Sequence, residues 1–225
     1  MIRSLYHGSN KIIDKPKFGY GKPYNDYGLG FYCTDSLQMA KKWGASVNQN
    51  GYANCYELDC DGLSVLDLNG TAFCLLHWLA VLLENREFDV PSGLALEAKD
   101  YIRTNFSVDY QSCDAIIGYR ADDSYFSFAQ DFINGTISYR QLNNAMHLGK
   151  LGQQFVLKSR QAFERIQFTG YEVAESKEWY AKKILRDKSA RREYFSAERG
   201  RRQRGDLYIM QIIDEEMIPG DPRLR

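Results

Sequence analysis

The sequence has few of the residues that build a metal centre or a disulfide framework. Only five cysteines occur in 225 residues, an odd number in which no two form a C-x-x-C pair. Neither a zinc knuckle nor a disulfide-stapled fold is therefore expected, and we predict that the protein holds no metal. Because unpaired thiols are typical of a reducing compartment, the cysteine pattern favours the cytoplasm.

A hydrophobic run long enough to cross a membrane is also missing. The longest apolar run, residues 72–83 (AFCLLHWLAVLL), falls short of the roughly 20 residues that a bilayer core requires. The N-terminal stretch MIRSLYHGSNKIID contains no apolar core of signal-peptide length. We expect the run to form a buried helix and the protein to have no membrane partner, although export by a machine that reads no N-terminal signal stays open.

The chain carries no net charge, since 29 basic side chains balance 29 acidic ones. This balance excludes a simple polybasic nucleic-acid binder. The charge is uneven, however, because residues 182–204 hold ten basic side chains against three acidic ones, a local net charge of +7. Such a segment could contact phosphates, dock an acidic antitoxin or target protein, or form a solvated helix face.

The composition is that of a folded globular protein, with 44% hydrophobic and 26% charged residues. A chain of this length buries enough surface for one substantial core. We expect one domain at residues 1–175 and a basic helical extension at residues 176–225 packed on it.

Hydrophobic periodicity and turn residues predict an α+β fold. Strands are expected at 3–9, 29–34, 53–59, 114–118 and 153–159. Helices are expected at 36–43, at 124–135, at 138–149, within 182–204 and, as a pair split by Pro91 and Gly93, within 70–106. Residues 205–213 suit either a closing strand or an amphipathic segment.

Three short motifs follow one another near the N-terminus. They are His7-Gly8-Ser9 at the end of a predicted strand, Gly28-x-Gly30-Phe31-Tyr32 in the next, and Asp35, Ala40 and Trp43 after it. Each motif alone is weak, because a histidine beside a glycine is common. The Gly-x-Gly pair is no phosphate loop, since it leads into a strand and lacks the third glycine and the lysine.

Together the motifs resemble the nicotinamide-binding half of the ADP-ribosyltransferase fold, in its His-Tyr-Glu branch of poly(ADP-ribose) polymerases and diphtheria-type toxins. Over nearly its whole length the sequence is also similar to an uncharacterised bacterial family, often found in toxin–antitoxin operons, that shares YHGS, GFYxT and GYRADDSYF. The resemblance implies an α+β fold with a split β-sheet and helical insertions. It also implies NAD as substrate, a cognate antitoxin as partner, and a protein or nucleic acid as acceptor.

The resemblance gives each matching residue a role. His7 would hydrogen-bond a ribose hydroxyl of NAD, and Gly8, which has no Cβ, would let its backbone approach the nicotinamide carboxamide. Tyr32 and Trp43 would sandwich the pyridinium ring. The other NAD-binding positions would be Ser9, Gly30, Ala40 and, in the GYRADDSYF segment, Asp122 and Tyr125.

Structural explanations compete with these roles. Tyr32 could pack on a sheet face, and Trp43 could belong to the core side of its helix. Asp122 could cap the N-terminus of the helix that follows it, and Tyr125 could fill the core.

The branch places a catalytic glutamate at the start of a later strand, where it stabilises the positive charge that develops as nicotinamide leaves. The matching strand here starts with Gln153 and Gln154, our remaining catalytic candidates. A glutamine brings no charge, and such a loss costs about 10² to 10³ in rate. Three explanations stay open: the family works with glutamine, Asp122 or Asp123 supplies the charge, or Gln153 replaces a native glutamate to protect an expression host.

We therefore expect an NAD-dependent mono-ADP-ribosyltransferase, the toxin of a bacterial toxin–antitoxin or defence system, that modifies an intracellular macromolecule. One rival is a non-catalytic module that binds NAD or ADP-ribose. A second is an NAD glycohydrolase, in which water is the acceptor. A third is a nucleic-acid-binding protein that uses the basic extension.

Overall fold

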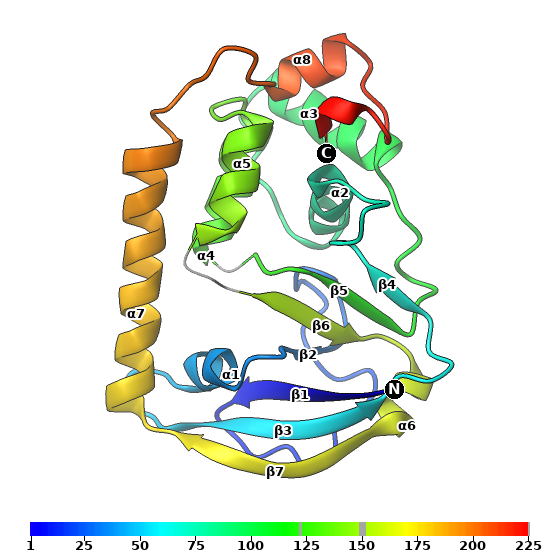
Figure 1. The fold of residues 1–225 in the computed structure, drawn as a ribbon, viewed down its shortest axis with the longest axis vertical. Helices are drawn as coiled ribbons and strands as arrows, with labels where there is room; N and C mark the ends of the chain where they lie inside the picture. The colour runs from blue at the N-terminus through cyan, green and yellow to red at the C-terminus, as the bar shows by residue number, and fades with distance from the viewer. Residues whose placement is uncertain (122, 149–151, 225) are drawn as a thin grey trace.

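The computed structural model describes residues 1–121, 123–148 and 152–224, and it contains two β-sheets and a group of helices (Figure 1). The three-stranded sheet is antiparallel and has the order β1-β3-β7. Its strands are β1 (Ile2–Ser9), β3 (Gly51–Asp59) and β7 (Ile166–Ala174). The four-stranded sheet has the order β2-β6-β5-β4, with β4 parallel to β5 and the other pairs antiparallel. Its strands are β2 (Phe31–Cys33), β4 (Val65–Asp67), β5 (Ala115–Tyr119) and β6 (Gln153–Leu157).

The two sheets meet at one point of their backbones. Tyr6 of β1 and Thr34, just after β2, exchange backbone hydrogen bonds of 2.8 and 2.9 Å. Beside this bridge, apolar side chains of both sheets form a small core to which Leu5, Tyr56 and Phe155 belong. The bridge and this core determine how the sheets face each other.

A group of helices lies on the far side of the four-stranded sheet and forms the main core with it (Figure 1). These helices are α2 (Leu75–Asn85), α3 (Gly93–Asn105), α4 (Asp123–Ile133), α5 (Tyr139–Met146) and α8 (Ile209–Asp214). As predicted, the longest apolar run forms a buried helix, since nine of the eleven residues of α2 are buried. Within the described ranges, no helix has both the length and the apolar character needed to span a membrane.

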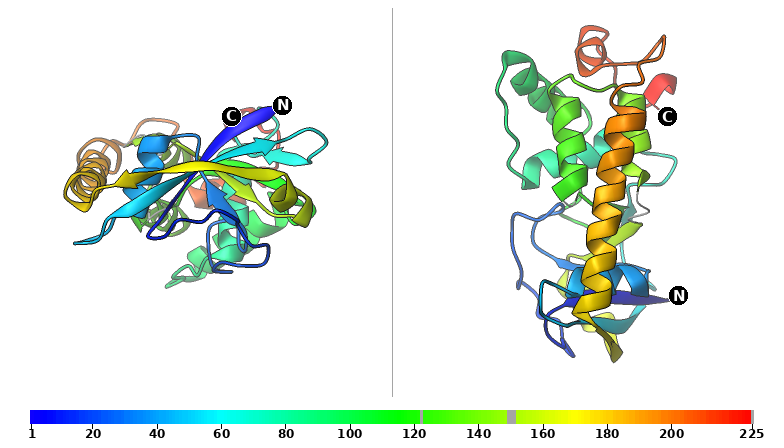
Figure 2. Two further views of the ribbon diagram at one scale, coloured as in Figure 1. Left: turned by 90° about the horizontal axis from the view of Figure 1, so that it is seen from below. Right: turned by 90° about the vertical axis from the view of Figure 1, so that its left-hand side faces the viewer.

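The remaining helices are α1 (Leu37–Gly44), α6 (Arg160–Arg165), α7 (Ser176–Glu193), the π-helical turn η2 (Tyr194–Glu198) and the short 3₁₀ helix η3 (Pro222–Leu224). Of these, α1 and α6 lie beside the sheets, and η2 and η3 pack against the helical group (Figure 1). Helix α7 runs along one side of the molecule from the three-stranded sheet to the helical group (Figure 2). Just after its end, Tyr194 stacks on Phe128 with ring centroids 3.9 Å apart, so the chain enters the main core where α7 ends.

Most predicted elements are confirmed, and local signals explain why. Serine side chains cap four of the helices by accepting a backbone N–H three residues on: Ser36 for α1, Ser92 for α3, Ser138 for α5 and Ser159 for α6. The strand alternative for residues 205–213 is wrong, because residues 209–214 form α8 and the Tyr208 N–H donates to the side chain of Gln211. Strand β7 was not predicted, because most of its residues are exposed and show little apolar alternation.

Helix α1 packs closely on β1 because Gly8 has no side chain. A Cβ at Gly8 would lie 2.1 Å from the carbonyl oxygen of Ala40 and 2.7 Å from the backbone nitrogen of Gly44. Ala40 is itself fully buried. The glycine and the small helix residue are thus required for this helix–strand contact, whatever else Gly8 does.

We predict that Gly8→Ala lowers the free energy of unfolding by at least about 2 kcal/mol, since the added methyl group meets backbone atoms that cannot move independently. The measurement is urea unfolding followed by circular dichroism. Gly93→Ala is the matched control, because a Cβ there has open space at the first turn of a helix. Equal stability of the two variants would contradict the packing argument.

Candidate functional site

A cavity of about 770 Å³ opens beside the point where the two sheets meet. Its walls come from β1, β2, β6, α1 and α7, from the long connection between β1 and β2, and from the residues just after α2 and β5. The residues that line it and that the sequence singled out are His7, Gly8, Gly30, Tyr32, Trp43 and Gln154. Six residues spread over nearly 150 positions of sequence therefore share one space.

Strand register explains why one of the two glutamines reaches the cavity. Tyr32 lies opposite Val156 in the β2–β6 pair, and Gln154 is two residues from Val156, on the same face. Gln153 faces the other way and is exposed. It lines a second, smaller cavity of about 190 Å³ together with Arg3 and Asp35.

Of the two catalytic candidates, Gln154 lines the larger cavity and Gln153 does not. Gln154 also borders the smaller cavity and is 4% exposed.

His7 is held in one tautomer. Its Nδ1 lies 2.7 Å from the backbone carbonyl oxygen of Tyr32, and because a carbonyl oxygen can only accept, Nδ1 carries the proton. Nε2 of the neutral ring is then a hydrogen-bond acceptor. The ring stacks on Phe31 with centroids 4.4 Å apart, and burial lowers the pKa of His7, so the neutral form is favoured.

Tyr32 offers its ring to the cavity, while its hydroxyl group has other partners. The hydroxyl donates to the carbonyl oxygen of Gly28 at 2.6 Å and accepts from the backbone N–H of Tyr27 at 3.0 Å. Burial raises the pKa of Tyr32 far above its ordinary value, so the hydroxyl stays protonated. Gly30 keeps this turn close to β6, because a Cβ there would lie 2.7 Å from Val156 Cγ1.

Trp43 carries a cation on its ring. The guanidinium carbon of Arg120 lies 4.1 Å from the indole centroid, a cation–π contact. Trp43 Nε1 is buried and has no hydrogen-bond partner among the described residues. The indole thus already accepts a positively charged flat group and retains an unused donor.

A buried carboxylate that the sequence reasoning missed lies next to Gln154. Asp26 is 5% exposed and accepts hydrogen bonds from Arg86 Nη1 at 2.8 Å, from the Ala121 backbone N–H at 2.9 Å and from Gln154 Nε2 at 3.2 Å. Burial raises the pKa of Asp26, and the Ala121 N–H and the charge of Arg86 oppose this effect. No pattern marks Asp26 in the sequence, because it lies in a turn-rich stretch where an acidic residue is ordinary.

The polarity of this contact orients Gln154. An ionised carboxylate only accepts, so the amide nitrogen of Gln154 faces Asp26 and the amide oxygen faces away. That Oε1 atom is buried and has no hydrogen-bond partner in the described part of the chain. A buried acceptor without a partner is unusual in a folded protein.

The cavity is strongly cationic although the whole chain is neutral. Six basic and two acidic side chains line it, an excess of four positive charges. The basic ones are Lys11, Lys15, Lys17, Arg86, Arg120 and Lys183. Two acidic phosphates of a ligand would be compensated here.

The connection between β1 and β2 is fixed at both ends. Fully buried Asn54 accepts from the Ile13 N–H at 2.9 Å and donates to the Lys11 carbonyl at 3.1 Å. At the other end, Lys158 Nζ donates to the carbonyl oxygens of Tyr27 and Leu29 at 2.6 and 2.8 Å. Sequence reasoning missed Asn54 and Lys158, whose partners lie far away along the chain.

Several expected NAD-binding residues do not line the cavity. Ser9 accepts from the Lys11 N–H through its hydroxyl, and Ala40 packs under Gly8. Tyr125 is fully buried, donates to the Leu148 carbonyl and packs on Phe128, so the core explanation holds for it. Asp122 lies outside the described residues. In the part of the chain that the structure describes, no group of three or more acidic, cysteine or histidine side chains could hold a metal ion.

We predict that the free energy of unfolding decreases as the pH falls below 6.5, the ordinary value for a histidine in the unfolded chain. The folded pKa of His7 lies lower, so the unfolded state takes up the proton first and gains stability. Burial lowers the pKa of His77 in the same direction. Urea unfolding between pH 5 and 8 measures this dependence. The free energy of unfolding should change less steeply with pH in His7→Gln and in His77→Gln than in the parent, and identical pH dependences would contradict the assignment.

The comparisons with known proteins identify a family and no activity. No curated protein and no solved structure matches the chain. Residues 3–168, about three quarters of the chain, match one family, and this span includes both sheets up to the first residues of β7. The chain therefore belongs to the family described as "Protein of unknown function (DUF3990)".

Proposed function

We propose that this protein is an NAD-dependent mono-ADP-ribosyltransferase with the split-sheet architecture of that superfamily. The observation that carries the proposal is one cationic cavity lined by His7, Tyr32, Trp43 and Gln154. An aromatic pair, a neutral imidazole acceptor and a partnerless amide oxygen are the groups that a nicotinamide riboside would need. Two short sheets with a cavity at their meeting point also suit this architecture.

The cavity supplies recognition for both halves of NAD. The nicotinamide ring would lie against Tyr32 and Trp43, where aromatic faces favour a cationic ring by about 0.5 to 2 kcal/mol. His7 Nε2 would accept a hydrogen bond from a ribose hydroxyl. The Arg120 guanidinium lies over the Trp43 ring. The pyridinium ring of NAD would replace it there, and Arg120 would then contact a phosphate.

Bond cleavage would be assisted by Gln154 and Asp26. The C–N bond between ribose and nicotinamide breaks, nicotinamide leaves with the bonding electron pair, and positive charge develops at the ribose C1′ and ring oxygen. Gln154 Oε1 would accept a ribose hydroxyl proton in a hydrogen bond, held in that orientation by Asp26. The acceptor nucleophile then bonds to C1′ and releases its proton to solvent.

The site retains a negative charge although Gln154 stands where a glutamate is expected. The Asp26 carboxylate lies one hydrogen bond behind it, at 3.2 Å from Nε2. Part of the electrostatic stabilisation that a glutamate would give directly would come through this pair, reduced by Arg86, which partly neutralises Asp26. This supports the first of the three explanations, that the family works with glutamine.

The biological setting belongs to the same proposal. A cytoplasmic toxin that modifies an intracellular macromolecule, and a cognate antitoxin that blocks it, follow from the resemblance in sequence. The cationic cavity supports such a pairing, since an acidic segment of an antitoxin would be attracted to it.

A non-catalytic NAD-binding module is the second candidate, and Gln154 favours it. A site that only binds a ribose needs an acceptor and no charge, and an amide oxygen suffices for that. Release of nicotinamide distinguishes the two, because the module would bind NAD and leave it intact.

We predict that Gln154→Leu slows nicotinamide release from labelled NAD by about 10²- to 10³-fold, the usual effect of losing one group that stabilises the transition state. Gln153→Leu should stay within about twofold of the parent, as expected for an exposed side chain on the opposite face. Gln153→Glu should give no gain. Single-turnover release, with thermal unfolding as a folding check, measures all three, and an equal loss in both leucine variants would contradict the assignment.

We predict that NAD binding weakens severalfold when salt rises from low to high concentration, because surface cations are screened from the two phosphates. Nicotinamide riboside, which has no phosphate, should bind with little salt dependence. Isothermal titration calorimetry with both ligands provides the comparison. Equal salt dependence would show that the cationic lining does not hold the phosphates.

A further inference from the structure

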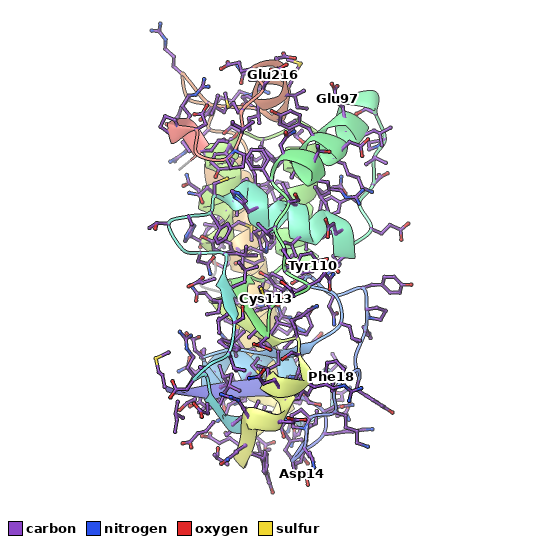
Figure 3. All side chains as sticks on the ribbon, turned by 90° about the vertical axis from the view of Figure 1, so that its right-hand side faces the viewer. Asp14, Phe18, Glu97, Tyr110, Cys113 and Glu216 are labelled. Atoms are coloured by element: carbon purple, nitrogen blue, oxygen red, sulfur yellow. The ribbon has the colours of Figure 1, made fainter. Side chains whose placement is uncertain are left out.

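The loop between β1 and β2, part of which lines the cavity, combines exposed aromatic rings with lysines. We call Lys15, Lys17, Phe18, Tyr20, Lys22 and Tyr24 the aromatic–lysine rim. Phe18, Tyr20 and Tyr24 are 42%, 75% and 80% exposed, which is high for large rings. They fall within seven consecutive residues, and Figure 3 shows Phe18 at the end of the molecule that carries the three-stranded sheet.

The rim is part of an anchored loop. Asn54 and Lys158 hold the two ends of the loop, as described above, so its backbone does not depend on burial of the rings. Phe18 lies under Arg160, whose guanidinium carbon is 4.6 Å from the ring centroid. The rings are thus presented to solvent from a fixed backbone.

The lysines of the rim carry charge that is not balanced locally. Among the described residues, no acidic side chain lies within ion-pair distance of Lys15, Lys17 or Lys22. Lys17 Nζ is 6.0 Å from the centroid of the Tyr20 ring. Aromatic rings and cations therefore alternate along one short stretch.

We propose that the aromatic–lysine rim binds single-stranded nucleic acid and that this nucleic acid is the acceptor. This inference rests on the proposed function for the transfer step, though not for the binding step. Bases of any sequence can stack on exposed tyrosines while lysines contact the phosphates, which is the usual construction of single-strand binding surfaces. A protein partner fits less well, because the buried centres of protein interfaces are depleted in lysine.

The rim adjoins the cavity in which the proposed transfer takes place. Lys15, Lys17 and Tyr20 line the cavity and belong to the rim, so the two are continuous. A strand along the rim would place one nucleotide at the cavity mouth. A base nitrogen or a phosphate oxygen would then bond to C1′ of the ADP-ribose as nicotinamide leaves, and any proton it carried would pass to water.

Binding is tested first, without NAD, by fluorescence anisotropy of a labelled single-stranded oligonucleotide of mixed sequence. The variant Lys15→Gln/Lys17→Gln/Lys22→Gln should bind at least tenfold more weakly. The slope of log Kd against log salt concentration should become shallower by about 2, at about 0.7 per lost phosphate contact. The matched control removes the same charge from the basic extension: Arg201→Gln/Arg202→Gln/Arg204→Gln should bind like the parent.

The aromatic part has its own pair of variants. Tyr20→Ala/Tyr24→Ala should lose binding at least tenfold at unchanged net charge. Tyr171→Ala removes a tyrosine that is 48% exposed on β7 and should leave binding unchanged. Unchanged melting temperatures of all variants show that they fold, as expected for exposed positions.

Transfer is tested second, with labelled NAD and a cell lysate, followed by separate nuclease and protease digestion. The inference is supported if nuclease releases the label and protease does not. The inference is overturned if only protease releases the label. It is also overturned if the variant of the basic extension loses affinity for the oligonucleotide while the rim variant keeps it. If the parent binds the oligonucleotide through the rim and releases no nicotinamide, the proposed function fails while the binding surface stands.

Discussion

The bridge between Tyr6 and Thr34 is the contact on which the site depends. It holds two small sheets together at a single backbone position, and the His7 imidazole adds a second link by donating to the Tyr32 carbonyl. One sheet thereby contributes an acceptor nitrogen, and the other contributes a ring and an amide oxygen. Because the sheets touch only locally, space remains beside the bridge, and that space is the cavity.

Within the cavity, hydrogen bonds to Asp26 determine how the neighbouring polar groups are oriented. The buried Asp26 carboxylate can only accept, so it orders the Arg86 guanidinium, the Ala121 N–H and the Gln154 amide around itself. The orientation of Gln154 follows, and its oxygen has no hydrogen-bond partner among the described residues. A neutral side chain on a strand thus acquires a defined direction from a loop residue far away in sequence.

The loop between β1 and β2 has a larger role than its composition indicates. It provides Asp26, three lysines of the cavity lining and the exposed rings of the rim. Its anchors, Asn54 and Lys158, are polar side chains that hold backbone groups, as a connection without regular hydrogen bonding requires. Binding groups on a loop held by a rigid scaffold are a common arrangement in proteins.

Local signals along the chain predicted most helices and strands, because apolar periodicity and serine caps are local properties. The resemblance in sequence implied that His7, Tyr32 and Trp43 share one site, and these residues line one cavity. Tertiary structure alone showed that Gln154 and not Gln153 lines the larger cavity, since which face of β6 meets the cavity depends on its pairing with β2. The structure also showed that Asp26 is buried and that Tyr125 lies in the core. Those outcomes arise from strand register and from contacts between separate segments, such as Asp26 with Arg86 and Gln154, and neither leaves a pattern along the chain.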